Sequence, residues 1–389
     1  MKVLTAMYTF RKGGSYDRFK MMIESFLEKQ WEVHCLSLTP IQIEHSFFHN
    51  HIIYFPFKKV DGLLAKLVVI SLFPLWAIWI AWRYKNDLII AFGSLYAFLQ
   101  SLSKWALKRP MVTLIRGSLN FGSKMQDAPI SLQYLNRLLE NLGIFSSDRI
   151  ITNNVSARDE IMKNLWGRKN IDVQVLYNNI PPMNIHEPET IFQTKNKYSI
   201  PEDSKVLVTA GILNQGKNLE ALIESLPRIE VKNIYILIVG DGSTKVDFHY
   251  KDFLQKLAKE LGVERKVIFT GWLEKEELWK IYLASDLFIL PSLSEGMPNA
   301  MLEALGSGLP CMGSNIPGIE DILKYDELIF DPMDEKSLAN KIELIFSDRQ
   351  FSDRVKKLCQ ERKEAFLFDW KEKVFQMVTM GFDCACQRM

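Results

Sequence analysis

Two glutamates, Glu295 and Glu303, are the residues of this chain best suited to chemistry on a ligand with several hydroxyl groups. Carboxylates accept hydrogen bonds from hydroxyl groups, and a sugar or a ribose offers several of them. The apolar run 287–290 before the pair predicts a strand that is covered on both faces of a parallel sheet. Because ligands of such sheets bind beyond the carboxyl ends of the strands, we expect both carboxylates at a ligand-binding edge.

The residues between the two glutamates predict a loop that leads into a helix. Prolines and a glycine interrupt the apolar pattern over residues 291–298. Asn299 is a favourable N-cap for a helix that continues through residues 300–305. Glu295 is therefore expected on the loop, and Glu303 on the first turns of the helix.

A second stretch, residues 211–218, reads Gly-Ile-Leu-Asn-Gln-Gly-Lys-Asn and lies between a strand pattern and a helix pattern. It nearly matches the phosphate-binding pattern G-x-x-x-x-G-K-[ST], in which the Lys contacts phosphate groups. Asn218 replaces the hydroxyl residue that would bind Mg²⁺, and Asp241 could supply an acidic metal partner. A P-loop nucleotide hydrolase therefore stays open as one interpretation of Lys217.

Two groups of residues in the first half of the chain also follow predicted strands. Gly13 and Gly14 come after the strand pattern 3–8, and glycines let the backbone approach a phosphate because no Cβ intervenes. Taken by themselves, these glycines are better explained by a tight strand-to-helix turn. Arg116 follows the strand pattern 111–115, and because it stays protonated it suits the stabilisation of negative charge. An ion pair at the end of a strand is its other interpretation.

The stretch 291–304 resembles the P-S-x-x-E-G-x-P-x-x-x-x-E-A signature of the retaining glycosyltransferases of family 4, also called group 1. Residues 211–218 resemble the family's G-R-L-x-x-x-K-G/N stretch, with Ile212 in place of the usual Arg. Residues 317–321 resemble its G-x-x-E segment, to which we assign no chemistry. The resemblance covers nearly the whole chain and is most specific over residues 205–334.

The resemblance implies a role for each candidate residue. Glu303 would hold the ribose hydroxyl groups of a nucleoside diphosphate sugar, and Glu295 those of the sugar. Glu295 and Arg116 would lie nearest the reacting carbon, with a front-face mechanism and a Glu295 nucleophile both open. No metal or other cofactor is expected, because Lys and helix dipoles neutralise the diphosphate. The donor-binding residues implied are Gly13, Gly14, Lys217, Gly296, Met297, Pro298, Asn299 and Glu303.

The same resemblance implies the α/β fold called GT-B, with two Rossmann-like domains facing across a cleft. A chain of 389 residues favours two domains. We expect an acceptor-side domain over residues 1–190 and a nucleotide-sugar-binding domain over residues 191–365. Residues 366–389 are expected to form a terminal helix that crosses back to the N-terminal domain.

The most apolar stretch, residues 67–82, has three Trp and is flanked by Lys and Arg. It is shorter than the roughly 20 residues that span a bilayer, and Pro74 interrupts it. Burial against the first domain is the first interpretation, and contact of an exposed Trp and Phe edge with lipid is the alternative. Residues 1–190 hold 22 Lys and Arg against 15 Asp and Glu, which suits an anionic membrane surface or a phosphorylated acceptor. An uneven distribution of surface charge without a partner explains the same counts equally well.

The five cysteines show no CxxC pair and predict reduced thiols in a cytoplasmic protein, and the N-terminus lacks the apolar region of a signal peptide. We therefore expect a cytoplasmic glycosyltransferase in peripheral contact with the inner face of the cell membrane. Its acceptor would be lipid-linked or a growing cell-surface polysaccharide such as a capsule, O-antigen or exopolysaccharide, and no nucleic acid is expected. The alternatives are a P-loop nucleotide hydrolase and a non-catalytic, membrane-associated protein that binds sugar nucleotides.

Overall fold

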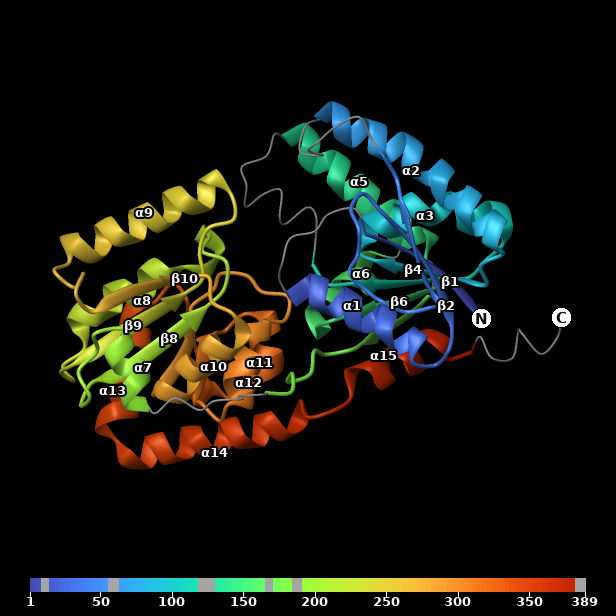
Figure 1. Cartoon of the computed structure of the whole chain (residues 1–389). Coiled ribbons are helices and arrows are strands. Elements are labelled where there is room, and N and C mark those ends of the chain that lie inside the picture. Colours follow the sequence, from blue (N-terminus) through green and yellow to red (C-terminus); the bar gives the residue numbers. More distant parts are fainter. Residues whose placement is uncertain (8–13, 55–62, 118–129, 165–170, 184–190, 382–389) are drawn as a thin grey trace. The chain divides into compact units, whose positions relative to one another are not determined.

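The computed structural model describes residues 1–7, 14–54, 63–117, 130–164, 171–183 and 191–381. The chain divides into two compact units, each built on its own parallel sheet (Figure 1). Unit 1 comprises Met1–Tyr177 and Asp369–Met389, and unit 2 comprises Asn178–Phe368. Each unit is described below by itself.

Unit 1 contains a seven-stranded sheet in the order β3-β2-β1-β4-β5-β6-β7, and every neighbouring pair is parallel. The order reverses at β1, as in Rossmann-like folds. Strands β4 and β5 are buried along their whole length, as expected where helices cover both faces of a parallel sheet. The strands are β1 (Lys2–Met7), β2 (Glu32–Ser37), β3 (Phe48–Ile52), β4 (Leu88–Phe92), β5 (Met111–Ile115), β6 (Arg149–Thr152) and β7 (Asp172–Val175).

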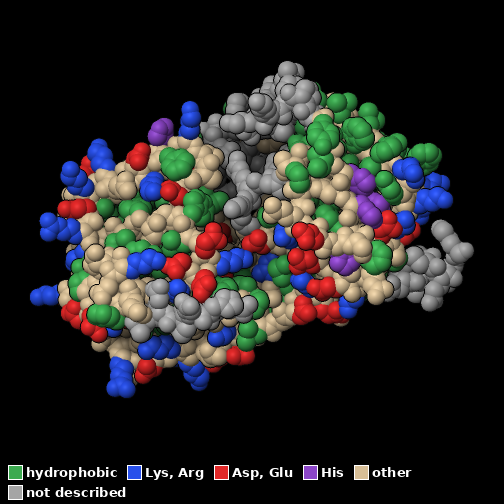
Figure 2. Space-filling view, viewed as in Figure 1, with side chains coloured by type: hydrophobic (Ala, Val, Ile, Leu, Met, Phe, Trp, Pro, Cys, Tyr) green, Lys and Arg blue, Asp and Glu red, His purple; other side chains and the backbone are tan. Residues whose placement is uncertain are grey.

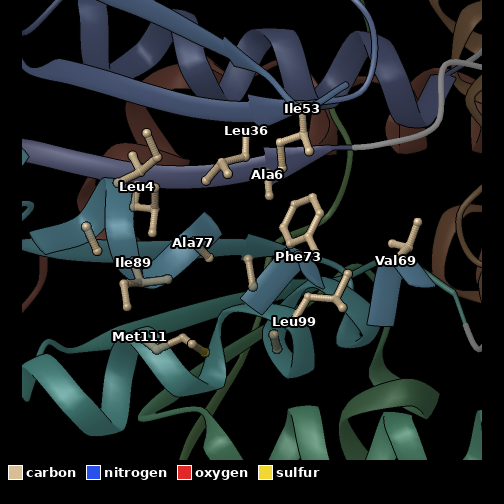
Figure 3. Close-up of a cluster of buried hydrophobic side chains, with 14 residues drawn as sticks. Leu4, Ala6, Leu36, Ile53, Val69, Phe73, Ala77, Ile89, Leu99 and Met111 are labelled. Atoms are coloured by element: carbon tan, nitrogen blue, oxygen red, sulfur yellow. The ribbon is translucent and has the colours of Figure 1, made fainter. Parts of the chain in front are cut away.

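The helices of unit 1 are α1 (Gly14–Leu27), α2 (Leu63–Tyr84), α3 (Ser94–Leu107), α5 (Ile130–Ser146), α6 (Val155–Asn164) and α15 (Trp370–Thr379). Figure 3 shows the core beneath α2, where Phe73 and Ala77 point toward Leu4, Ala6 and Leu36 of the sheet. Figure 1 shows α2, α3 and α5 together on one side of this sheet. None of the helices in the described part of the chain is long and apolar enough to cross a membrane.

Unit 2 contains a six-stranded parallel sheet in the order β10-β9-β8-β11-β12-β13. Its strands are β8 (Lys205–Ala210), β9 (Ile234–Val239), β10 (Val267–Gly271), β11 (Leu287–Leu290), β12 (Cys311–Ser314) and β13 (Ile329–Phe330). Its helices are α7 (Ile191–Lys197), α8 (Leu219–Ser225), α9 (Lys245–Glu260), α10 (Lys275–Ala284), α11 (Asn299–Gly306), α12 (Pro317–Leu323), α13 (Glu335–Ser347) and α14 (Arg349–Ala365). Three short 3₁₀ helices are η1 (Gln215–Lys217), η2 (Leu226–Arg228) and η3 (Asp326–Leu328).

The boundaries between the units differ from the sequence-based positions at 190/191 and 365/366. The first lies at Tyr177/Asn178, because the Asn178 amide already bonds within unit 2, to the Met297 carbonyl (3.2 Å) and to Asn299 Oδ1 (2.8 Å). The second lies at Phe368/Asp369, just before α15. Helix α15 packs on α1 of unit 1, and its Trp370 is fully buried.

Sequence patterns missed two elements of unit 1 that lack a clear apolar period. Strand β3 carries His49, Asn50 and His51, and helix α3 carries apolar residues on most of its surface. Helix α6 begins at Val155, and the Asn154 side chain accepts the Ala157 N–H at 2.7 Å.

Candidate functional site

The centre of the candidate site in unit 2 is a contact between Lys217 and Glu295. The Lys217 ammonium lies 2.5 Å from Glu295 Oε1, and both side chains are largely buried, with exposed fractions of 20% and 13%. Lys217 follows β8 and Glu295 follows β11, which are neighbouring parallel strands. The structure therefore brings together, at the carboxyl edge of one sheet, two residues that the sequence proposed separately.

Hydrogen bonds fix the loop that carries Glu295. The hydroxyl of the buried Ser292 donates to Glu295 Oε1 at 2.9 Å. The Leu293 N–H donates to the Gly216 carbonyl at 2.9 Å, which ties this loop to the segment that carries Lys217. Because both loops are bonded to each other, the ammonium and the carboxylate are held in place before any ligand arrives.

Gly318, on the first turn of α12, lies directly against the same loop. A Cβ at Gly318 would come within 2.3 Å of the Gly296 carbonyl oxygen and 2.6 Å of the Glu295 carbonyl oxygen. No side chain fits in that space, so only glycine lets α12 approach this closely. The sequence assigned no chemistry to residues 317–321, and Gly318 and Ser292 are positioning residues that it missed.

Helix α11 carries Glu303 in its second turn, and that side chain is half-buried. Burial first, and then the charge of Glu303, raise the pKa of the Tyr282 hydroxyl on α10 well above its usual value. The first N–H groups of α11 have no carbonyl within the helix to bond, as at any helix start. The helix therefore offers donors and a carboxylate at the same edge as Lys217.

The four residues before Glu303 that were expected to bind the donor have more specific places. The proposed N-cap Asn299 is wrong: the helix begins at Asn299 with Pro298 as its cap, and the Asn299 side chain accepts from Asn178. Met297 is buried and its sulfur accepts the Asn178 N–H at 3.0 Å. Pro298 has no N–H to donate, so of this stretch only Gly296, Met297 and Asn299 have a backbone donor.

The Lys217 segment does not have the layout expected of a P-loop. Residues Gln215–Lys217 form a 3₁₀ helix, and Asn218 then adopts a left-handed conformation (φ 49°) before α8 begins. The Asn218 side chain donates to the Pro332 carbonyl at 2.9 Å. Asp241, the proposed acidic metal partner, instead forms an ion pair with Lys251 of α9 at 3.0 Å. Lys217 thus precedes the helix that a P-loop Lys would open.

The remaining candidates belong to unit 1. Gly13 lies outside the described residues, and Gly14 is the first residue of α1, which follows β1. Arg116 follows β5, with its guanidinium over the Phe92 ring at 5.8 Å from the centroid. Burial and the nearby Arg18 lower the pKa of Arg116 to about 9, so the group is still charged at neutral pH. Two cations therefore lie near each other in unit 1.

Comparison with known proteins shows a family-model match in the C-terminal half of the chain. Residues 190–362 match the family model described as glycosyl transferases group 1. An uncharacterized glycosyltransferase of Methanocaldococcus jannaschii is 28% identical over 56% of this chain and 55% of its own length. The UDP-Gal:alpha-D-GlcNAc-diphosphoundecaprenol alpha-1,3-galactosyltransferase of Escherichia coli is 31% identical over 39% of this chain and 38% of its own length. The chain thus spans about half, or less, of these curated relatives.

The fold of the whole chain is also found among solved structures. HepE of Anabaena, in complex with UDP and glucose, aligns with a TM-score of 0.74 and 18% identity, covering 99% of this chain and 100% of that one. At this identity the alignment concerns the fold alone, and it confirms the predicted GT-B class with two Rossmann-like domains. By sequence, residues 190–362 match the group 1 glycosyl transferases, and the whole chain has the GT-B fold.

Proposed function

We propose that this protein transfers a sugar from a nucleoside diphosphate sugar to a lipid-linked or saccharide acceptor, with retention of the anomeric configuration. The observation that carries the proposal is the contact between Lys217 and Glu295 at the carboxyl edge of β8 and β11. A cation there suits a diphosphate, and a carboxylate beside it suits the hydroxyl groups of the attached sugar. Glu303 on α11 would accept from the ribose hydroxyl groups.

In the proposed reaction Lys217 stabilises the leaving group. Negative charge develops on the diphosphate as the bond between its oxygen and the anomeric carbon breaks, and a fixed ammonium lowers the energy of that state. The acceptor hydroxyl attacks the anomeric carbon from the same face, and its proton passes to the leaving phosphate oxygen. A double displacement through a Glu295 ester is the alternative, and mass spectrometry of the trapped enzyme distinguishes the two.

We further propose that the transfer needs no metal, because Lys217 and the N–H groups at the start of α11 neutralise the diphosphate. A chelator should then leave the transfer rate unchanged. A P-loop hydrolase would instead lose its activity when the chelator removes Mg²⁺. The place of Lys217 before α8, and of Asp241 in an ion pair with Lys251, favours the transferase over the hydrolase.

The first experiment measures release of nucleoside diphosphate from a panel of sugar nucleotides. We expect slow hydrolysis of one donor and its loss in Glu295→Ala and Lys217→Ala. Lys217→Ala should also weaken binding of the nucleoside diphosphate by about 10–150-fold, since a hydrogen bond to a charged group contributes about 1.5–3 kcal/mol. Glu295→Ala should leave that binding nearly unchanged, because the carboxylate faces the sugar.

Lys197 and Glu277 provide the matched control, since they form an ion pair elsewhere in unit 2. Lys197→Ala and Glu277→Ala should keep both donor hydrolysis and donor binding. ATP hydrolysis that depends on Mg²⁺ and Lys217, with no sugar nucleotide turned over, would contradict the transferase. Donor binding without turnover in the presence of lipid-linked acceptors would indicate a non-catalytic binding protein.

A different observation supports contact with a membrane surface. Helix α2 buries Val69, Phe73 and Ala77 against the sheet and exposes Leu and Trp side chains on its other side. Burial in the first domain therefore describes one side of the helix, and the other side is available for contact with lipid. Phe73, which was expected at the exposed edge, is buried. Exposed apolar residues continue over α3 and α5, and Figure 2 shows them gathered in green. We call this surface the apolar face: Leu72, Leu75, Trp76, Trp79, Trp82, Leu102, Trp105, Ile130, Tyr134, Leu138, Leu142 and Phe145.

The charges around the apolar face suit anionic lipid headgroups. Helices α2 and α3 contain no Asp or Glu, and α5 contains only Glu140. Arg83, Lys85 and Lys108 are exposed at the ends of α2 and α3. Trp side chains next to basic residues are typical of a protein surface that lies in the interface of a bilayer. We therefore propose peripheral binding to an anionic membrane, where a lipid-linked acceptor would be found.

Sedimentation with vesicles of phosphatidylglycerol and phosphatidylcholine tests the membrane proposal. Replacing Trp76, Trp79 and Trp82 together by Ser should weaken vesicle binding by at least about tenfold, since each large apolar side chain contributes about 1.5–3 kcal/mol when buried. Trp272→Ala removes an exposed Trp of unit 2 and should bind as the unchanged protein does. Equal binding of the triple variant would contradict this use of the apolar face.

A further inference from the structure

Four side chains with metal-binding atoms gather on one face of the unit 1 sheet, at its amino edge. His34 of β2 lies opposite His49 of β3 in parallel register. Glu32 and His51 lie two residues away from them along their own strands, so all four share a face because side chains alternate along a strand. Figure 2 shows histidine side chains in purple at the surface beside the apolar face.

The atoms of this cluster lie close together. His34 Nε2 is 3.0 Å from Glu32 Oε1, and His49 Nε2 is 3.3 Å from the same oxygen. One atom from each of the three residues lies within 4.8 Å of the others. On the far side of its ring, His34 Nδ1 lies 2.9 Å from His51 Nε2. Glu32, His34 and His49 thus offer three ligand atoms around one point, and His51 lies on the other side of the His34 ring.

We propose that Glu32, His34 and His49 form a binding site for a divalent transition-metal ion, with Zn²⁺ as the best match. Zinc binds imidazole nitrogen and carboxylate oxygen at about 2.0–2.1 Å, so the ligand atoms of a tetrahedral site lie about 3.3 Å apart. The two distances to Glu32 Oε1 are close to that value. Two His and one Glu leave the fourth position for water.

The neighbours of the three ligands fit this role. With the metal on His34 Nε2, the Nδ1–H of the same ring donates to His51 Nε2, and such a partner orients a metal-binding His. Lys2 pairs with the other oxygen of Glu32, Oε2, at 2.8 Å and leaves Oε1 to the metal. His49 stacks on His34 with ring centroids 4.9 Å apart, so its ring must turn, which its 42% exposure allows.

The place of the site indicates a structural role. Glu32 begins β2 and His49 lies near the start of the edge strand β3, at the amino edge of the sheet, whereas ligands of such folds bind beyond the carboxyl ends. His34 also stacks on Tyr84, the last residue of α2, at 4.3 Å between centroids. A bound metal would join β2 to β3 beneath the end of α2. This inference does not depend on the proposed transferase activity.

The test is titration of the chelator-treated full chain with ZnCl₂ by calorimetry, and with Co²⁺ by visible absorption. We expect one equivalent to bind, with the intense absorption bands of four-coordinate Co²⁺, and a higher Tm in the presence of zinc. His49→Ala should weaken zinc binding at least about tenfold and remove the Tm shift. His51→Phe, which removes only the partner of His34, should weaken binding by about 10–100-fold.

His249→Ala is the matched control, because it removes an exposed His of unit 2. It should bind zinc as the unchanged protein does. Equal affinity of the unchanged protein and His49→Ala, or the absence of one-equivalent binding, would overturn the proposal and leave a hydrogen-bonded histidine cluster. Circular dichroism checks that each variant is folded, and the half-exposed position of His49 favours that outcome. Metal binding is read without a donor sugar, so failure here leaves the proposed function untouched.

Discussion

At the scale of single residues, the candidate site depends on how closely the Glu295 loop is held. Glu295 bonds to Lys217 and Ser292, and its own backbone carbonyl lies against Gly318. A carboxylate on a loose loop would have to be ordered before it could bind a sugar, and that ordering costs conformational entropy. Here the fold has already fixed the loop, and Ser292 and Gly318 contribute to this although we propose no contact of theirs with the donor.

Gly318→Ala tests this arrangement. The added methyl group would overlap the carbonyls of Gly296 and Glu295, so the loop must shift. We expect donor binding to weaken by about 5–150-fold, since overpacking of this kind costs about 1–3 kcal/mol. Calorimetric titration with the donor that the panel identifies measures the effect.

Gly262→Ala separates this local effect from a general loss of stability. Gly262 has φ +67° and a Cβ there meets nothing within 4 Å, so Ala costs about 1–2 kcal/mol of backbone strain far from the loop. It should lower Tm and leave donor affinity as it was. If Gly318→Ala kept full donor affinity, the idea that this glycine positions Glu295 would have to be abandoned.

The sequence predicted Lys217, Glu295 and Glu303 because residue type and spacing suffice to identify charged groups at strand ends. It did not predict the roles of Ser292, Asn178 or Gly318. Asn178 bonds to a residue more than a hundred positions away, and Gly318 matters because of the space that it leaves empty. A local sequence pattern indicates neither property, so the roles of these residues can be recognised only from the tertiary structure.

At the scale of elements, apolar periodicity predicted strands such as β5 and β11, whose residues are all buried. It failed for β3, where the alternating polar residues form the histidine cluster, and for α3, whose exposed Leu102 and Trp105 blur the amphipathic pattern. Strand β3 carries part of the proposed metal site, and α3 carries part of the apolar face for which we propose contact with a membrane. A pattern that departs from simple burial is expected where a surface has a further use.

Helices α3 and α5, which carry part of the apolar face, meet at Gly143. A Cβ at Gly143 would lie 2.0 Å from the Ser94 carbonyl oxygen and 3.1 Å from the Phe98 nitrogen, which are backbone atoms that cannot move independently. We expect Gly143→Ala to lower the free energy of unfolding by at least about 1–3 kcal/mol. Urea denaturation measures this free energy of unfolding.

Asn141→Ala, on the exposed side of the same helix, is the control and should change the free energy of unfolding little. Equal stability of both variants would show that the helices separate without cost.

At the scale of the whole molecule, the chain leaves unit 1 at Tyr177 and returns to it at Asp369. The returning helix α15 is held on unit 1 by several contacts. Lys371 pairs with Glu24 and Glu28 of α1, and Arg149 donates to the carbonyl oxygens at the end of α15. Unit 1 therefore includes residues that follow unit 2 in the sequence.

A substitution of Trp370 tests how much α15 contributes to the stability of unit 1. Trp370 is fully buried in α15, and the Arg18 guanidinium lies 5.3 Å from its ring centroid. Trp370→Ala should lower the stability of unit 1 by about 3–5 kcal/mol, the usual cost of removing a buried Trp side chain. Because unit 2 keeps all its own contacts, hydrogen exchange should rise in the strands of unit 1 and stay unchanged in those of unit 2. Trp272→Ala, a half-exposed Trp of unit 2, should affect neither. Faster exchange in both units would mean that the chain unfolds as one cooperative body, and the division at Tyr177 and Asp369 would then describe contacts without describing stability.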